Sequence, residues 1–270
     1  MVAIGLMNPS RQKKKLETGQ RKDFPPIRLD LTDGEKPKRK RGSARVYEEL
    51  REDILWIRIE PGSVLDEVAL AKRFDMSRTP IREALVMLQS DDLVTFLPNR
   101  TSIVTPHMLD NMNEHLDTHL LLARAVVRMA AQFRTEENLE RIRLAASAYE
   151  EALQTNDVYQ IYGSDLALHR EISRSCHNHF TRKFHDLSLD CGRRAYVLHY
   201  YPEFREEERK TSLAEHRELI SAIESQDAAR ADAAITQHVR SELNVIKRTL
   251  DPQVGFEMEI TTGGAASKKD

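Results

Sequence analysis

The stretch Ser77-Arg78-Thr79-Pro80-Ile81-Arg82-Glu83-Ala84-Leu85 decides the fold of this chain. It predicts a helix on which Arg78 and Arg82, four residues apart, point along one face. The first residue of the stretch is a favourable N-cap, and its proline falls in the first helical turn, where proline is tolerated. Arginine binds guanine edges or phosphates, and threonine contacts a phosphate or a thymine methyl. Arg78, Thr79 and Arg82 are therefore candidates for reading DNA, although such an arginine pair also occurs on solvated surface helices.

The flanking sequence places this helix within a larger motif. Apolar residues at helical spacing over 65–74 predict a second short helix, and residues 75–76 form a tight break between the two. Two β-type runs between residues 91 and 105 surround a polar turn that ends in Arg100, which predicts a hairpin. Two short helices and a hairpin indicate a winged helix-turn-helix, whose second helix enters the major groove. Arg100, on the wing, is a further candidate for contacting DNA.

Several ordered motifs between residues 43 and 105 resemble the N-terminal domain of the GntR superfamily of bacterial transcription regulators. These motifs are Val46-Tyr47-Glu48-Glu49-Leu50, Glu60-Pro61-Gly62, Leu65-Asp66-Glu67 and the stretch 77–85. The resemblance implies that the chain binds double-stranded operator DNA as a homodimer through the three reading-helix candidates. It also implies that Arg45, at the start of the first helix, contacts a phosphate.

Three positions depart from the pattern of that family. Arg58, Asp92 and Thr101 stand where the family usually has glycine, the last of them at the tip of the wing. Glycine adopts a positive φ freely, whereas a threonine does so at a cost. The sequence therefore leaves the contact between the wing and DNA open.

The composition is that of a protein with two domains of ordinary size and no membrane span. The chain has 270 residues, of which 40% are hydrophobic and 31% are charged. It has neither a run of about 20 apolar residues nor a secretion signal. Cys176 and Cys191 are too few for a disulfide framework or a thiolate zinc site, which suggests reduced thiols in a cytoplasmic protein. The formal charge is +4 over residues 1–105 and −6 over the rest, which suits a front half that meets a polyanion.

Both ends of the chain are expected to be disordered. Residues 1–41 lack hydrophobic periodicity and contain two clusters of lysine and arginine, at 11–15 and 36–41. This basic arm would add salt-dependent affinity for phosphates, or it is simply a solvated tail. Residues 251–270 are predicted to be a second disordered tail.

After a winged domain at 42–105, the sequence predicts an all-α antiparallel bundle at 106–250, with Pro106 as the hinge between them. The first helix carries a broad apolar face over 116–131. The later helices are predicted at 136–154, 157–176, 180–200, 204–224 and 227–249. The fold class is therefore mainly α, with a small β-hairpin wing.

Four residues of the predicted bundle form a candidate metal site. Asp165 and His169 lie four residues apart on one helix, while His216 and His238 fall on the last two helices. Three imidazoles and one carboxylate facing one cavity would bind a divalent transition metal and leave positions for water or a ligand. Zinc or nickel suits these ligands, and iron or manganese remains possible. Taken singly, each histidine is more often an exposed or core residue.

The segments 165–172, 215–223 and 234–239 resemble the ordered motifs of the FCD domain, the ligand-binding half of the FadR branch of GntR regulators. The resemblance covers roughly residues 110–245 and implies that Asp165, His169, His216 and His238 hold a metal in the bundle core.

It also implies an effector site. His119 stands where the family often has an arginine that binds an organic acid, and it keeps a possible hydrogen-bond donor. Arg193 and Arg194 are candidates for the missing arginine role. The remaining histidines considered are interpreted as structural or exposed: His177, His179, His185 and His199.

The sequence as a whole predicts a transcriptional regulator rather than an enzyme. The bundle would bind a small carboxylate beside or on the metal, and binding would change the placement of the winged domains in the dimer. Repression relieved by the ligand is the expected mode. Three alternatives stay open: a metal-dependent enzyme that uses the same site, a direct sensor of the metal ion, and a purely structural metal.

Overall fold

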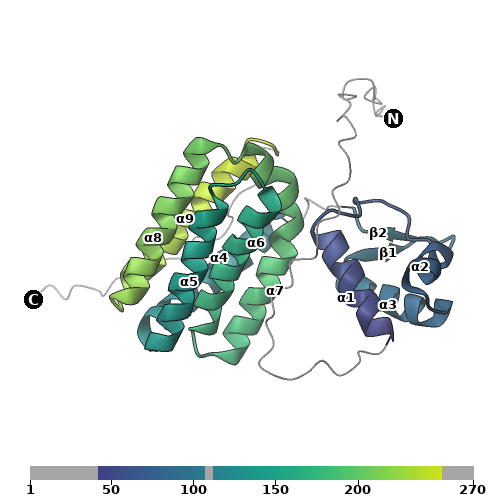
Figure 1. Cartoon of the computed structure of the whole chain (residues 1–270), viewed down its shortest axis with the longest axis horizontal. Coiled ribbons are helices and arrows are strands. Elements are labelled where there is room, and N and C mark those ends of the chain that lie inside the picture. Colours follow the sequence, from purple (N-terminus) through teal and green to yellow (C-terminus); the bar gives the residue numbers. More distant parts are fainter. Residues whose placement is uncertain (1–41, 107–111, 251–270) are drawn as a thin grey trace, which may run out of the picture. The chain divides into compact units, whose positions relative to one another are not determined.

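The computed structural model describes residues 42–106 and 112–250 of the chain (Figure 1). The first range holds α1 (Gly42–Leu55), α2 (Glu67–Phe74), α3 (Arg78–Ser90), β1 (Val94–Phe96) and β2 (Ser102–Val104). The second range begins with α4 (Met112–Phe133), α5 (Glu136–Ala152), α6 (Val158–Arg174) and α7 (His179–Ala195). It ends with the π-helical turn η1 (Tyr196–Tyr200), the 3₁₀ turn η2 (Tyr201–Glu203), α8 (Glu206–Glu224) and α9 (Ala228–Lys247). The predicted arm at 1–41, the predicted tail at 251–270 and the residues that follow the predicted hinge, 107–111, lie outside the described residues.

The helix-turn-helix forms where the sequence predicts it. The Asp66 side chain caps α2 by accepting hydrogen bonds from the backbone amides of Val68 and Ala69, each at 2.7 Å. Asp75, with φ of 52°, ends α2 in the left-handed conformation, which confirms the predicted break. Ser77 occupies the N-cap position of α3, but its side chain makes no capping hydrogen bond. The expected contribution of this serine to the start of α3 is therefore absent.

One hydrophobic core fixes α3 against α1 and the wing. Buried apolar residues on α1, α2, α3 and the hairpin form a single cluster that includes Leu50, Ile54, Ile81, Leu85 and Val104. Burial of each such side chain stabilises the fold by about 1.5–3 kcal/mol. The apolar face of α3 is thus held in the core, and its opposite, polar face is left to solvent.

The wing is the antiparallel pair β1–β2, in which Val94 lies opposite Val104. Positive φ values occur at Asp92 (56°) and at Arg100 (65°), but not at Thr101. The wing therefore turns one residue earlier than the glycine pattern implied, through Arg100. Near the end of α1 the positive φ likewise falls on Ile57, one residue before Arg58.

The helices α4 to α9 make the predicted bundle, with α4 packed against α6, α7, α8 and α9 (Figure 1). Small residues such as Ala130, Ala222 and Ala231 are completely buried in the main core, which lets α4, α8 and α9 approach closely. Asp157, Asn178 and Asp227 cap α6, α7 and α9. None of the described helices combines the length and the apolar composition that a membrane span requires.

The predicted helix at 180–200, the fourth of the bundle, is not regular along its whole length. The α-helical geometry of α7 ends at Ala195, and the chain continues as the π-helical turn η1. The first residue of that turn, Tyr196, points into the interior of the bundle and lines a cavity there.

Candidate DNA-reading surface and metal centre

The N-terminal half of α3 presents its polar side chains on one open surface. The side chains of Arg78 and Arg82 are 64% and 67% exposed, and Thr79 is also exposed. These three residues line a shallow groove together with Ser43, Glu67, Glu83, Val86 and Met87. Two exposed guanidiniums and a hydroxyl on one helix face can meet phosphates and base edges in a major groove.

Glu67, at the start of α2, lies between the two arginines. It accepts hydrogen bonds from Nη2 of Arg78 at 3.3 Å and from Nε of Arg82 at 3.1 Å. A second bond to Arg82, from its Nη2, is 3.3 Å long, and the Glu67 side chain is only 15% exposed. Both guanidiniums are therefore held toward one another across the turn. The sequence offered Glu67 as part of a family motif without assigning it a role.

The other two predicted DNA contacts lie on separate elements. Arg45 is exposed on α1 and pairs with Glu49 at 2.8 Å, one helical turn away. Arg100 is exposed at the tip of the wing. Each can reach a polyanion from its own element, since neither side chain is buried.

The candidate metal ligands come together from three helices of the bundle. Asp165 and His169 extend from α6, His216 from α8 and His238 from α9, and all four are buried. Nε2 of His216 lies 3.3 Å from Nε2 of His169 and 3.2 Å from Oδ1 of Asp165. One nitrogen from each of the three histidines lies within 4.8 Å of the others. This spacing suits donors that surround one ion, which transition metals bind at about 2.0–2.2 Å.

Hydrogen bonds to residues outside the four-residue cluster fix the orientation of two of its histidine rings. Nδ1 of His216 donates to the Ser212 carbonyl at 2.9 Å, and Nδ1 of His238 donates to Glu215 at 3.0 Å. Both acceptors can only accept, so each Nδ1 carries the proton and each Nε2 faces inward as a ligand atom. The Nε2 atom of His238 is buried without a hydrogen-bond partner among the described residues. A divalent cation would satisfy it, and the residues therefore fit a metal.

The charges around the cluster agree with that fit. Burial lowers the pKa of His169 to about 3 and keeps the ring neutral, as ligation requires. Burial opposes ionisation of Asp165, but the close approach of His216 and the other nearby imidazoles brings its pKa below the usual range. Burial also opposes protonation of His238, yet the carboxylates of Glu242 and Glu215 raise its pKa well above the usual value. Those carboxylates favour positive charge at this position, whether a proton or a metal supplies it.

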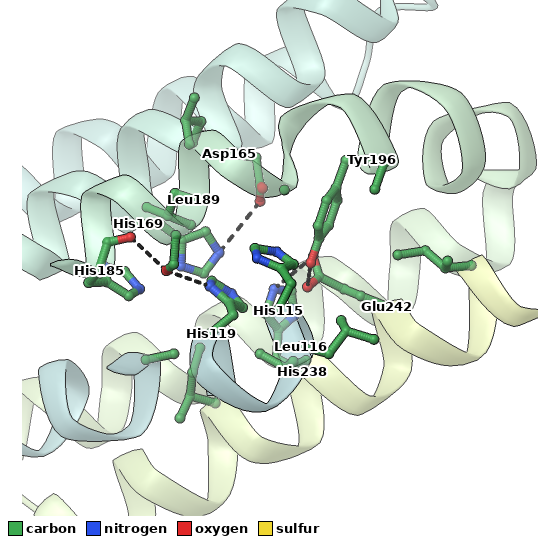
Figure 2. Close-up of a pocket in the computed structure, with 18 of the residues that line it drawn as sticks. His115, Leu116, His119, Asp165, His169, His185, Leu189, Tyr196, His238 and Glu242 are labelled. Carbon is green, nitrogen blue, oxygen red and sulfur yellow. Dashed lines mark hydrogen bonds and ion pairs between the residues drawn. The ribbon is translucent and has the colours of Figure 1, made fainter. Parts of the chain in front are cut away.

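A cavity of about 30 Å³ lies beside the cluster, lined by α4, α6, α7, η1 and α9 (Figure 2). It has room for about two water molecules. Gly192 on α7 belongs to its wall, and a Cβ atom there would lie 3.1 Å from Nε2 of His115. The absence of a side chain at this position therefore keeps the histidine end of the cavity open.

Three histidine rings stand in a row along this wall (Figure 2). The ring centroids of His115 and His119 are 6.1 Å apart, and those of His119 and His185 are 5.7 Å apart. Burial lowers the pKa of His119 and of His185 to about 3, so both rings are neutral. The effector candidate His119 thus lines the cavity. His185 lies there too, although the sequence suggested a structural or exposed role for it, and His115 was not singled out.

The two arginines predicted to bind an effector are engaged elsewhere. Arg193 donates to Glu52 at 2.8 and 3.0 Å, and Arg194 donates to the Thr105 carbonyl at 2.5 Å. Neither occurs among the described residues that line the cavity. The structure therefore places Arg193 and Arg194 apart from His119, outside the described wall of this cavity.

Tyr196 and Glu242 are the cavity residues that sequence reasoning missed. The Tyr196 hydroxyl donates to Oε2 of Glu242 at 2.7 Å, and Oε1 of Glu242 lies 3.3 Å from Nε2 of His238 (Figure 2). One signal could have found Glu242, because it follows His238 by four residues and so shares its helix face.

Comparison with known proteins gives the chain its family. Residues 43–104 match the family of bacterial regulatory proteins named gntR, and residues 114–241 match the FCD domain. The chain belongs to the GntR family of transcriptional regulators. Within the family it is a regulator with a C-terminal FCD domain, and the matched families and relatives are transcriptional regulators rather than enzymes.

The similarity between this GntR regulator and two named relatives extends over most of the length of each relative. The HTH-type transcriptional repressor RspR of Escherichia coli K12 is 26% identical over 203 residues, which cover 73% of this chain and 85% of that protein. The HTH-type transcriptional regulator LutR of Bacillus subtilis 168 is 24% identical over 220 residues, which cover 73% of this chain and 97% of that protein.

Solved structures share the fold of this GntR regulator at low sequence identity. E. coli McbR/YncC superposes with a TM-score of 0.69 at 17% identity, over 78% of this chain and 99% of that one. A GntR regulator from Rhodococcus sp. RHA1 gives a TM-score of 0.62 at 19% identity, over 76% of this chain and 97% of that one. The winged, mainly α fold predicted from the sequence is thus confirmed.

Proposed function

We propose that this GntR regulator is a one-component switch that binds a short palindromic operator as a homodimer and responds to a small metabolite. The observation that carries the proposal is the buried convergence of Asp165, His169, His216 and His238 in the helical half of a chain whose other half exposes a reading helix. The proposal assigns DNA contacts to Arg78, Thr79 and Arg82, with Arg45 and Arg100 on flanking elements.

The four-residue cluster would hold a divalent transition metal, with zinc or nickel best suited to three imidazoles and one carboxylate. When bound, the metal supplies a Lewis-acidic position that an oxygen of the effector can occupy. The chain holds His216 and His238 in the ligating tautomer through Ser212 and Glu215. The best candidate for the effector is a small organic acid, and His119 is the predicted effector-site residue that faces the cavity.

The direction of control proposed here is repression relieved by the effector. The relative RspR carries the word repressor in its name, which supports this sign for a chain of the same domain order. An effector shifts DNA affinity only by its difference in affinity between the DNA-competent and incompetent arrangements. As a DNA-binding regulator, the protein would act in the bacterial cytoplasm.

The DNA-binding half of the proposal is tested by selecting genomic fragments with the purified full-length protein at low ionic strength. We expect a preferred fragment that contains a palindrome. Arg82→Ala should weaken binding to it by about 1–3 kcal/mol and relax preference at one base position if Arg82 reads a base. Recovery of no preferred fragment would contradict operator binding.

The metal and dimer are tested together by native mass spectrometry of freshly purified protein. We expect a dimer with one divalent ion per chain. His216→Ala should lose the ion, whereas His179→Ala, at an exposed position of α7, should keep it. Stoichiometric metal in the His216 variant would remove that residue from the site.

A direct metal sensor is the alternative that the same cluster favours, since four protein ligands could make the ion itself the signal. In that case operator affinity should follow the free metal concentration, and chelation alone should release DNA. DNA binding that survives chelation but is lost on adding a metabolite excludes the sensor.

A further inference from the structure

Once a metal takes the place of a proton on His238, no side chain in the described wall of the cavity carries positive charge. Asp165 and Glu242 supply its formal charges, and neither lysine nor arginine occurs among the described lining residues. His119 and His185 do not compensate, because burial lowers the pKa of each to about 3. A metal held by the cluster would therefore be the cation nearest to an effector bound in the cavity. The cavity can accordingly neutralise few negative charges on that effector.

Glu242 offers an acceptor at the place where the metal ligands meet the cavity. Its side chain is buried, and Tyr196 donates to Oε2 at 2.7 Å, which fixes the carboxylate. Oε1 is left 3.3 Å from Nε2 of His238. A carboxylate accepts hydrogen bonds only, so a ligand beside Oε1 has to present a donor.

His119 offers a second acceptor. The Ser188 hydroxyl donates its proton to the His185 carbonyl at 2.8 Å, so its oxygen can only accept from Nδ1 of His119, 3.0 Å away. Nδ1 of His119 therefore carries the proton of this neutral ring, and Nε2 is an acceptor. The buried Nδ1 of His185 has no hydrogen-bond partner among the described residues, which also points to a ligand in this wall.

We propose that the effector is a small acid with a single carboxylate and a hydroxyl or amino group on the adjacent carbon, selected by Glu242. The proposal rests on the proposed function, in which one carboxylate oxygen is bound at the metal. The neighbouring hydroxyl or ammonium donates to Oε1 of Glu242, and His119 accepts from any further donor. A second carboxylate would face Glu242 without a cation to balance it and is excluded.

The ligand class is tested by calorimetric titration of zinc-loaded full-length protein with four probes: glycolate, glycine, acetate and malonate. Glycolate or glycine should bind about tenfold or more tightly than acetate, which lacks the donor. Malonate, which adds a second carboxylate, should bind more weakly than glycolate. Acetate or malonate binding as tightly as both donor-bearing probes overturns the proposal. The glycolate and glycine arms show whether the hydroxyl or the ammonium is preferred.

Glu242→Gln tests the residue that makes the selection. The variant keeps the shape of the side chain but removes its charge, so the preference for the donor-bearing probe over acetate should fall by about tenfold and malonate should gain affinity. Glu218→Gln makes the same change on the exposed side of α8, where Glu218 pairs with Arg230, and should leave the ranking unchanged. An unchanged ranking in Glu242→Gln protein of unchanged thermal midpoint overturns the proposal.

Metal content separates this inference from the proposed function. Zinc is measured on every sample by mass spectrometry, and the probes are titrated whatever the content. Zinc lost from Glu242→Gln but not from Glu218→Gln would make Glu242 a metal ligand and overturn the selection role. If wild-type protein holds zinc and binds its operator but does not prefer the donor-bearing acids, the inference fails and the function stands. If it holds no zinc, the metal site fails, and the ranking still decides the role of Glu242.

Discussion

Glu67 contacts both arginines of the candidate DNA-reading surface, Arg78 and Arg82, and this contact matters more for orientation than for folding. Ion pairs as exposed as those to Arg78 and Arg82 contribute only about 0–1 kcal/mol to stability. What the pair supplies is a fixed direction for two long, otherwise flexible side chains. The negative charge also reduces the general attraction of α3 for phosphates.

Glu67→Gln should therefore reduce discrimination between operator and unrelated DNA. We expect affinity for unrelated duplex to rise, and the ratio of the two affinities to fall by about five- to tenfold, equivalent to ~1 kcal/mol. Dissociation constants for the selected fragment and a scrambled duplex, measured at two salt concentrations, test this. Glu83→Gln makes the same charge change in the same groove without a described bond to either arginine. Equal effects of both variants would mean that charge alone, not positioning, is responsible.

His119 and His185 should make the stability of the helical half depend on pH. Burial lowers the folded pKa of each to about 3, whereas an unfolded histidine titrates near 6.5. As the pH falls below 6.5 the unfolded chain takes up protons first, so stability is complete above that value and declines toward pH 3. At pH 5.5 each ring lowers the free energy of unfolding by about 1.4 kcal/mol relative to its high-pH value.

His119→Gln should accordingly remove about 1 kcal/mol of the stability change between pH 7.5 and pH 5.5. Urea unfolding at the two pH values, in a chelator so that metal release plays no part, gives the measurement. The exposed His179→Gln variant is the control and should behave as the wild type does. If the His119 variant keeps the full wild-type pH dependence, then this ring is not buried in its neutral form.

At the scale of single elements, the turn of the wing contains a residue with an unfavourable backbone conformation. Arg100 has φ of 65°, which is costly for a residue with a Cβ atom. Arg100→Gly should raise the free energy of unfolding by about 0.5–1 kcal/mol, even though operator affinity falls if the guanidinium contacts DNA. Thr101→Gly should lower the free energy of unfolding by a similar amount, because Thr101 has no positive φ. Urea unfolding of the protein without DNA measures both changes. If Thr101→Gly stabilised the protein and Arg100→Gly destabilised it, the turn of the wing would lie at Thr101 and not at Arg100.

The helices follow from local sequence and the four candidate metal ligands from the resemblance to the FCD domain, whereas the cavity follows from neither. Periodicity and capping residues such as Asp157 and Asn178 predict where helices begin, and i, i+4 spacing joins Asp165 to His169. His115, His185 and Tyr196 meet only because α4, α7 and η1 pack together, and no local pattern encodes that packing. Sequence reasoning therefore predicted His119 but missed its neighbours. It also placed Arg193 and Arg194 in the effector site, because the sequence alone does not distinguish an arginine that lines a cavity from one that forms an ion pair.

At the scale of the whole molecule, one ion would join α6, α8 and α9. Removal of the metal with a chelator should lower the thermal midpoint, and added zinc should restore it in a concentration-dependent way. At a free zinc concentration 100 times the dissociation constant, the stabilisation is about 2.7 kcal/mol. Differential scanning calorimetry measures the shift. The midpoint of His216→Ala should not respond to chelator, and an unchanged wild-type midpoint after verified metal removal would show that the ion does not stabilise the fold.

The π-helical turn at Tyr196–Tyr200 has a consequence for how this protein can change. Such turns contain one residue more than a regular helical turn and occur frequently at functional sites. Substitutions along the turn would alter side chains one at a time, but deleting a single residue would rotate everything that follows by about a quarter of a turn or more. Tyr200 and Tyr201 would then leave their aromatic cluster with Tyr162. The number of residues in this segment therefore matters more to the packing than the identity of any one of them.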